Sequence, residues 1–187
     1  MRVTREQAAL NRERIVETAS RRFRERGFEG IGVADLMKEA GLTHGGFYGH
    51  FGSKEDLMAE ACAAALARSR ERWDKSARAH PEDPVGAVAR MYLTPRHRDA
   101  PGDGCVMAAL ASDAARQGPA VRHAFVQGLR STFDSLAAWV KGGTPAARRR
   151  KAIATYASWV GAMVLARAAA DDAPLSKEIL EAVAHES

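Results

Sequence analysis

Apolar residues recur every three or four positions along most of the chain, and glycine or proline interrupts each run. In the first run, Ile15, Ala19 and Phe23 follow at a spacing of four, with Thr4 before the run and Gly27 after it. This spacing predicts an amphipathic helix with a polar cap at its start and a glycine at its end. Alternating apolar and polar positions typical of strands are absent, and alanine is abundant. The pattern therefore predicts an all-α fold.

The same reading divides the whole chain into about nine helices. After the first helix we expect further helices at residues 33–40, 44–51, 53–77, 85–92, 105–116, 119–140, 145–170 and 176–184. The stretch 94–104 holds two prolines and two glycines and is expected to be irregular. Residues 171–174 (Asp-Asp-Ala-Pro) are expected to break the chain between the last two helices.

Residues 33–56 have the pattern of a helix-turn-helix. A short helix ends at Gly41, whose freedom to adopt a positive φ suits a sharp turn, and Leu42 can pack between the two helices. Thr43 stands where a side chain can cap the second helix. Ser53 is the expected N-cap of the next helix, with Asp56 at its N3 position.

Composition narrows the class of protein. The chain has 187 residues, a formal net charge of +5 and two cysteines, which are too few for a disulfide scaffold and lack metal-site spacing. The N-terminus lacks the apolar segment of a signal peptide, and the longest uncharged run of the C-terminal half, 152–166, is shorter than the ~20 residues of a membrane span. We expect a cytoplasmic protein without membrane contact, bound metal or cofactor.

The segment from Gly41 to Leu57, GLTHGGFYGHFGSKEDL, resembles the signature of the TetR/AcrR family of bacterial transcriptional regulators. The upstream segment from Arg14 through Phe23 to Phe28 is similar to the first helix of that family. The resemblance implies a helix-turn-helix DNA-binding domain at residues 1–53 and a helical effector-binding and dimerisation domain at 54–187. It implies a homodimeric repressor that binds a palindromic double-stranded operator and is released by a small molecule.

The resemblance also implies which residues face DNA: Thr43, His44, Gly45, Tyr48, His50 and Lys54. Physical chemistry agrees with this set, because Tyr48 can donate to a phosphate and Gly45 permits close approach of the backbone. His50 can equally serve as a solvated or capping residue, and Lys54 can be an ordinary exposed residue at a helix start. Phe47 and Phe51 are expected in the core.

The sequence departs from the family pattern in the same region. Gly32 stands where relatives usually place Thr or Ser, and Ala34 replaces a polar residue. Gly45, Gly46 and Gly49 lie in the recognition segment, each costing ~1 kcal/mol relative to alanine in a helix interior. A helical ligand-binding or interaction protein that has lost specific DNA binding is therefore the alternative, with a helical-bundle enzyme third because no acid–base or metal pair is evident.

Bulky residues of the middle helices are candidates for the wall of an effector pocket. Together they suggest a largely apolar ligand, although each is also a candidate for the core: Met91, Tyr92, Met107, Leu110, Phe125, Phe133 and Trp139. The helix at 145–170 is apolar around most of its circumference, which favours burial against a partner as well as within the protomer. The predicted dimer contacts are Tyr156, Trp159, Val160, Met163 and Leu180.

Two further features bear on function. Cys105 is expected at a helix N-terminus, where the choice lies between a thiol sensor and a small buried side chain. Residues 1–26 hold eight arginines and four glutamates. This local surplus suggests that the first helix, through Arg2, Arg5 and Arg12, attracts DNA phosphates that the recognition segment cannot.

Overall fold

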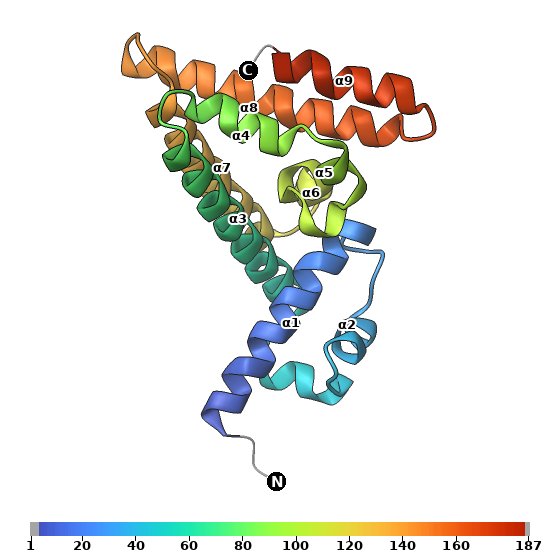
Figure 1. The fold of residues 1–187 in the computed structure, drawn as a ribbon. Coiled ribbons are helices and arrows are strands. Elements are labelled where there is room, and N and C mark those ends of the chain that lie inside the picture. The colour runs from blue at the N-terminus through green and yellow to red at the C-terminus, as the bar shows by residue number, and fades with distance from the viewer. Residues whose placement is uncertain (1–3, 186–187) are drawn as a thin grey trace.

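The computed structural model describes residues 4–185, and every regular element in that range is helical. It contains nine α-helices and two short 3-10 helices (Figure 1). The all-α prediction is confirmed. The helices are α1 (Arg5–Arg26), α2 (Val33–Glu39), η1 (His44–Gly49), α3 (Lys54–Ala79), α4 (Pro84–Tyr92), α5 (Pro95–Asp99), η2 (Pro101–Asp103), α6 (Val106–Ala114), α7 (Pro119–Trp139), α8 (Pro145–Ala168) and α9 (Ala173–His185).

Helix starts follow the predicted capping chemistry. The Thr4 hydroxyl accepts from the backbone N–H of Gln7, and Ser53 accepts from that of Asp56, both at 3.1 Å. Thr144 caps α8 in the same way, ahead of Pro145 in its first turn. Each cap satisfies a backbone donor that the first turn of a helix leaves free.

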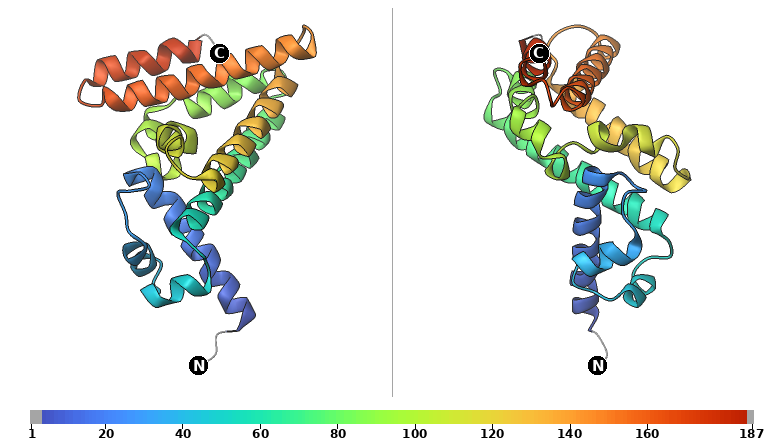
Figure 2. Two further views of the ribbon diagram at one scale, coloured as in Figure 1. Left: turned by 180° about the vertical axis from the view of Figure 1, so that it is seen from behind. Right: turned by 90° about the vertical axis from the view of Figure 1, so that its right-hand side faces the viewer.

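Helix α3 packs against both α1 and α7, and α8 packs against both α7 and α9. Helices α3 and α7 lie side by side, α8 and α9 pack together, and α4 to α6 fill the space below α8 (Figures 1 and 2). The first half of α3 packs against α1, while Trp73 in its second half contacts Tyr92, Tyr156 and Trp159 with ring centroids 5.6–5.8 Å apart. A single helix therefore joins the two ends of the molecule.

Two sequence predictions about loops were wrong. The stretch 94–104 is not irregular: Thr94 caps α5 by accepting from the His97 N–H, and η2 follows at once. These helices are too short for apolar periodicity to reveal them. The last helix begins at Ala173 rather than Ser176, because Pro174 lies in its first turn, where proline's missing N–H costs nothing.

Candidate nucleic-acid interface and effector cavities

The turn between α2 and η1 is built as the sequence predicts. Gly41 has a φ of +71°, its N–H donates to the Lys38 carbonyl, and the Leu42 N–H donates to the Met37 carbonyl at 2.8 Å. These two bonds form a Schellman motif, which needs a left-handed residue at the position of Gly41. The turn therefore fixes the direction in which η1 leaves α2.

The recognition segment is a 3-10 helix, shorter than the helix predicted at 44–51. Phe47 anchors it, since its side chain is buried and its ring stacks on Phe51 with centroids 5.6 Å apart. The predicted core placement of both phenylalanines is confirmed. A Cβ added at Gly45 or Gly49 would meet no atom within 4 Å, so these glycines leave open surface.

The residues on the outer side of η1 are exposed. Tyr48 is 71 % exposed, and its ring meets that of Phe47 edge to face at 5.3 Å. Thr43, His44 and Gly45 are exposed as well, and we call these three residues with Tyr48 the recognition surface. The Thr43 side chain does not cap η1, contrary to the sequence expectation, so its hydroxyl is not committed to the helix start.

His50 and Lys54 stand apart from the recognition surface. His50 is partly buried and follows η1 as its C-cap. Lys54 opens α3, and its Nζ lies 3.8 Å from the carboxylate of Glu29. The Lys54 ammonium is thus held beside the helix start without being buried, in a geometry that leaves donors for a phosphate.

Arg12 holds the helix-turn-helix to α1 and α3. Its guanidinium lies 4.2 Å from the centre of the Phe51 ring, its Nε donates to Glu60 at 3.1 Å, and its Nη1 donates to the His50 carbonyl. The sequence hypothesis gave Arg12 to DNA phosphates, but all of these contacts are within the protein. Arg2 lies outside the described residues.

The comparisons with known proteins agree on one family. A model of the bacterial regulatory proteins of the tetR family matches residues 15–61, which hold the helix-turn-helix and its flanking helices. The helix-turn-helix segment of this chain is thus similar to that of the TetR/AcrR family. The repressor NemR of Escherichia coli is 26 % identical over 178 residues, covering 90 % of this chain and 89 % of NemR. The regulator TtgR of Pseudomonas putida is 32 % identical over 94 residues, and this match spans only 44 % of TtgR.

Solved TetR-family structures share the fold over nearly the whole chain. The reduced form of E. coli NemR superposes with a TM-score of 0.79 at 24 % identity, covering 94 % of both chains. A TetR-family regulator of Cytophaga hutchinsonii gives 0.80 at 21 % identity, covering 96 % of this chain and 94 % of the other. The TetR-like arrangement thus extends from the helix-turn-helix through α9.

The seven predicted effector-pocket residues do not line one cavity. Met91 and Tyr92 line a cavity of about 520 Å³ with Trp73, His97 and Cys105. Met107, Phe125 and Phe133 line an apolar groove of about 560 Å³ between α6, α7 and α8. Leu110 is buried in the core and Trp139 packs against it. Neither of these two residues lines either hollow.

The first cavity contains the polar groups that the apolar reading of the pocket missed. His97 Nε2 accepts from the Cys105 N–H at 2.8 Å and His97 Nδ1 lies 2.7 Å from the Tyr92 carbonyl, so the imidazole is neutral with its proton on Nδ1. Burial lowers the pKa of His97 and raises that of Tyr92. In the described structure the buried Tyr92 hydroxyl has no hydrogen-bond partner.

Four of the five predicted dimer residues face the protomer interior. Tyr156, Trp159, Met163 and Leu180 are buried, and only Val160 keeps partial exposure, within the apolar groove. A side chain covered in its own protomer has no surface left for a partner. The exposed apolar side chains of α8 are Ile153, Val164 and Leu165, which sequence periodicity did not separate from the buried ones.

Both cysteines are buried in the described structure. Cys62 is buried, which raises the pKa of its thiol to about 12, and the Cys105 sulfur lies 3.4 Å from the Tyr156 hydroxyl. Between residues 4 and 185, three or more potential ligands nowhere gather in a geometry that could hold a metal ion. Over the same range no helix combines the length and apolarity needed to cross a membrane.

Proposed function

We propose that the protein is a ligand-responsive, DNA-binding transcriptional regulator that acts as a homodimeric repressor in the cytoplasm. The observation that carries this proposal is the recognition surface, where an exposed tyrosine and open glycine backbone stand on a segment anchored by buried Phe47. The match to the tetR-family model and the printed functions of the relatives, a regulator and a repressor, support it.

DNA contact in this proposal is divided between two kinds of group. Tyr48 and Thr43 offer hydroxyls to phosphates, and His44 offers ring nitrogens to a base edge or phosphate. His50 and Lys54 contact the backbone beside the groove, while Gly45 lets the protein backbone come close. Because few side chains can read bases, operator choice depends partly on DNA shape.

Dimerisation brings two recognition surfaces to one palindromic operator. In the proposed dimer α8 meets its copy, and its exposed apolar residues Ile153, Val164 and Leu165 supply the contact. Burial at this contact explains why α8 carries three large exposed apolar side chains. The contact is tested by measuring the molecular mass in solution, and hence the oligomeric state, of Leu165→Glu beside that of the wild type.

The experiment that tests the function is binding of the full chain to DNA fragments upstream of its own gene and the neighbouring genes, titrated with salt. We expect specific binding whose affinity falls steeply with salt, as counterions return to the phosphates. Tyr48→Ala should weaken it about tenfold, and Arg130→Gln, on an exposed face of α7, should leave it unchanged. A folded dimer that binds no fragment specifically would instead support the ligand-binding alternative.

A further inference from the structure

A cavity of about 540 Å³ lies where α1, α3 and the α5–η2 segment meet. Glu17, Thr18 and three arginines of α1 form one wall, and the end of α2 contributes Glu39. Arg68 and Arg72 of α3 and the α5–η2 residues form the other wall. We call this space the arginine cavity. It joins the part of the chain that carries the helix-turn-helix to the part that carries the other cavities.

The lining of the arginine cavity is strongly basic. Three carboxylates, Glu17, Glu39 and Asp103, face six arginines: Arg21, Arg22, Arg24, Arg68, Arg72 and Arg96. Arg21 and Arg22 pair with Glu25, and Arg22 also pairs with Glu39. None of the ion pairs formed among residues 4–185 includes the other four arginines. Of these four, Arg24 feels the charge of a nearby carboxylate, that of Asp103.

Arg24 is the partly buried arginine at the floor of this cavity. Its Nε and Nη2 donate to the Gly102 carbonyl, the former at 2.9 Å, and its Nη1 donates to Ser20 at 2.7 Å. Burial and the nearby charge of Arg68 lower the pKa of Arg24 to about 10. The nearby Asp103 carboxylate only partly offsets the cost of holding this guanidinium out of water beside like charges, and a bound anion would relieve that cost further.

The arginine cavity adjoins the cavity of Met91 and Tyr92. Arg72, Arg96 and Asp103 line both spaces. The second space adds the aromatic rings of Trp73 and Tyr92 and the buried Tyr92 hydroxyl that lacks a partner. Side by side they offer a basic end and an aromatic end with one unused polar group.

We propose that the two cavities together bind a small organic anion, with its phosphate or carboxylate group on Arg24, Arg68 and Arg72 and its apolar body against Trp73 and Tyr92. Arginine suits both head groups because its planar fork donates two parallel hydrogen bonds to paired oxygens. A duplex is excluded as occupant, since the site is a recess of small-molecule size and not a groove along the surface.

The position of the site gives the anion a route to DNA binding, and this consequence rests on the proposed function. An anion bridging α1 to α3 and η2 binds best where the two walls are close. If the DNA-bound form holds the walls differently, the anion lowers DNA affinity by the ratio of its affinities for the two forms. The ligand then regulates without touching the recognition surface.

Calorimetric titration of the full chain at constant ionic strength tests the head-group site. Inorganic pyrophosphate probes phosphate oxygens and citrate probes carboxylates, with sodium chloride replacing each anion as the blank. We expect at least one to bind, and the tighter one identifies the head group. Arg68→Gln/Arg72→Gln should weaken binding at least about tenfold, as two charge-assisted hydrogen bonds are lost. Both arginines are exposed, so the double variant should fold.

The matched control is Arg78→Gln/Arg130→Gln, which removes the same charge from exposed sites outside the cavity. It should bind as the wild type does. Absence of binding by both anions, or equal weakening in both double variants, would overturn the site. Phenyl phosphate should bind more tightly than inorganic phosphate, and equal affinity would refute the role of the aromatic end.

Failure of the site and failure of the proposed function give different results. Anion binding by a chain that binds no DNA fragment specifically keeps the site and removes the function. Specific DNA binding by a chain that ignores both anions does the reverse. With both present, pyrophosphate or citrate should weaken DNA binding in wild type and not in Arg68→Gln/Arg72→Gln, and an equal effect in the two would contradict the coupling.

Discussion

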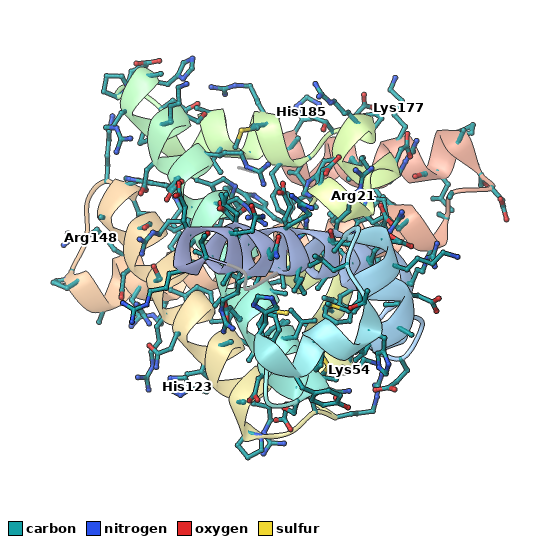
Figure 3. The ribbon with its side chains drawn as sticks, turned by 90° about the horizontal axis from the view of Figure 1, so that it is seen from below. Arg21, Lys54, His123, Arg148, Lys177 and His185 are labelled. Carbon is teal, nitrogen blue, oxygen red and sulfur yellow. The ribbon has the colours of Figure 1, made fainter. Side chains whose placement is uncertain are left out.

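Arg12 and Arg24 lie in the two halves of α1 and differ in their partners. In the N-terminal half, the Arg12 guanidinium lies over the Phe51 ring and donates hydrogen bonds to Glu60 and to the His50 carbonyl. These contacts hold the recognition segment to the rest of the domain. In the C-terminal half, Arg24 donates to the Gly102 carbonyl and lies with Arg68 at a cavity. Seen from below, Arg21 and Lys54 lie to opposite sides of α1 (Figure 3). A basic helix is therefore not by itself a DNA-binding surface.

The largest loss of stability is expected at Phe47, which anchors the recognition segment. Phe47→Ala should destabilise the protein by about 3–5 kcal/mol, because it removes a buried ring and leaves a cavity beneath η1. Tyr48→Ala, next in the chain and exposed, should leave the urea midpoint unchanged while weakening DNA binding. Similar unfolding curves for the two variants would show that η1 is not held by its core residue.

Arg12 distinguishes a structural arginine from a phosphate contact. Arg12→Met should lower the free energy of unfolding by about 1–2 kcal/mol, since the Glu60 carboxylate and His50 carbonyl lose their donor. The salt dependence of DNA affinity should keep its slope. A slope reduced by about one unit would instead place Arg12 on a phosphate, as the sequence alone suggested.

Ser53 and Thr43 precede adjacent helices and differ in use. Ser53→Ala should cost about 1 kcal/mol of stability, because the hydroxyl caps α3. Thr43→Ala should change stability by less than about 0.5 kcal/mol, since its hydroxyl makes no cap, and should weaken DNA binding. Chemical denaturation of both variants measures the difference, which vanishes if Thr43 does cap η1 in solution.

The stability that His97 contributes at the cavity wall depends on pH. Burial and the charges of Arg167 and Arg72 lower its pKa in the folded state, so the unfolded chain binds the proton more readily. The stability that neutral His97 contributes is present above its unfolded pKa, about 6.5, and is lost as pH falls through the lower folded value.

Melting temperature measured between pH 7.5 and 5 should therefore fall toward acid. In His97→Gln it should start lower and fall less, because the titrating ring that bonds the Cys105 N–H is gone. His123→Gln, at an exposed position, is the control and should follow wild type. Parallel curves for His97→Gln and wild type would mean that another group governs the acid response.

Local chemistry explains what the sequence could predict. Thr4, Ser53 and Gly41 act on backbone groups within a few residues of themselves, so their roles were visible in the pattern. The faces of α8 were not, because Trp159 and Leu165 are both apolar and only the packed fold buries one and exposes the other.

The interaction partners of the arginines could not be predicted from the sequence either. Arg12 and Arg24 lie on one helix with the same charge, and their partners, Glu60 and Gly102, are far along the chain. The arginine cavity forms from residues of α1, α2, α3, α5 and η2, which no periodicity brings together. Charge counted along the chain could therefore not tell a DNA contact from a ligand site.

In the proposed regulator, DNA and anion use separate surfaces, and DNA affinity in the absence of added anion tests this separation most directly. With a labelled upstream fragment at fixed salt, Tyr48→Ala should lose about tenfold in affinity, whereas Arg68→Gln/Arg72→Gln should stay within about twofold of wild type. Weakened DNA binding by the arginine variant, with unchanged binding by Tyr48→Ala, would contradict the separation of the two surfaces.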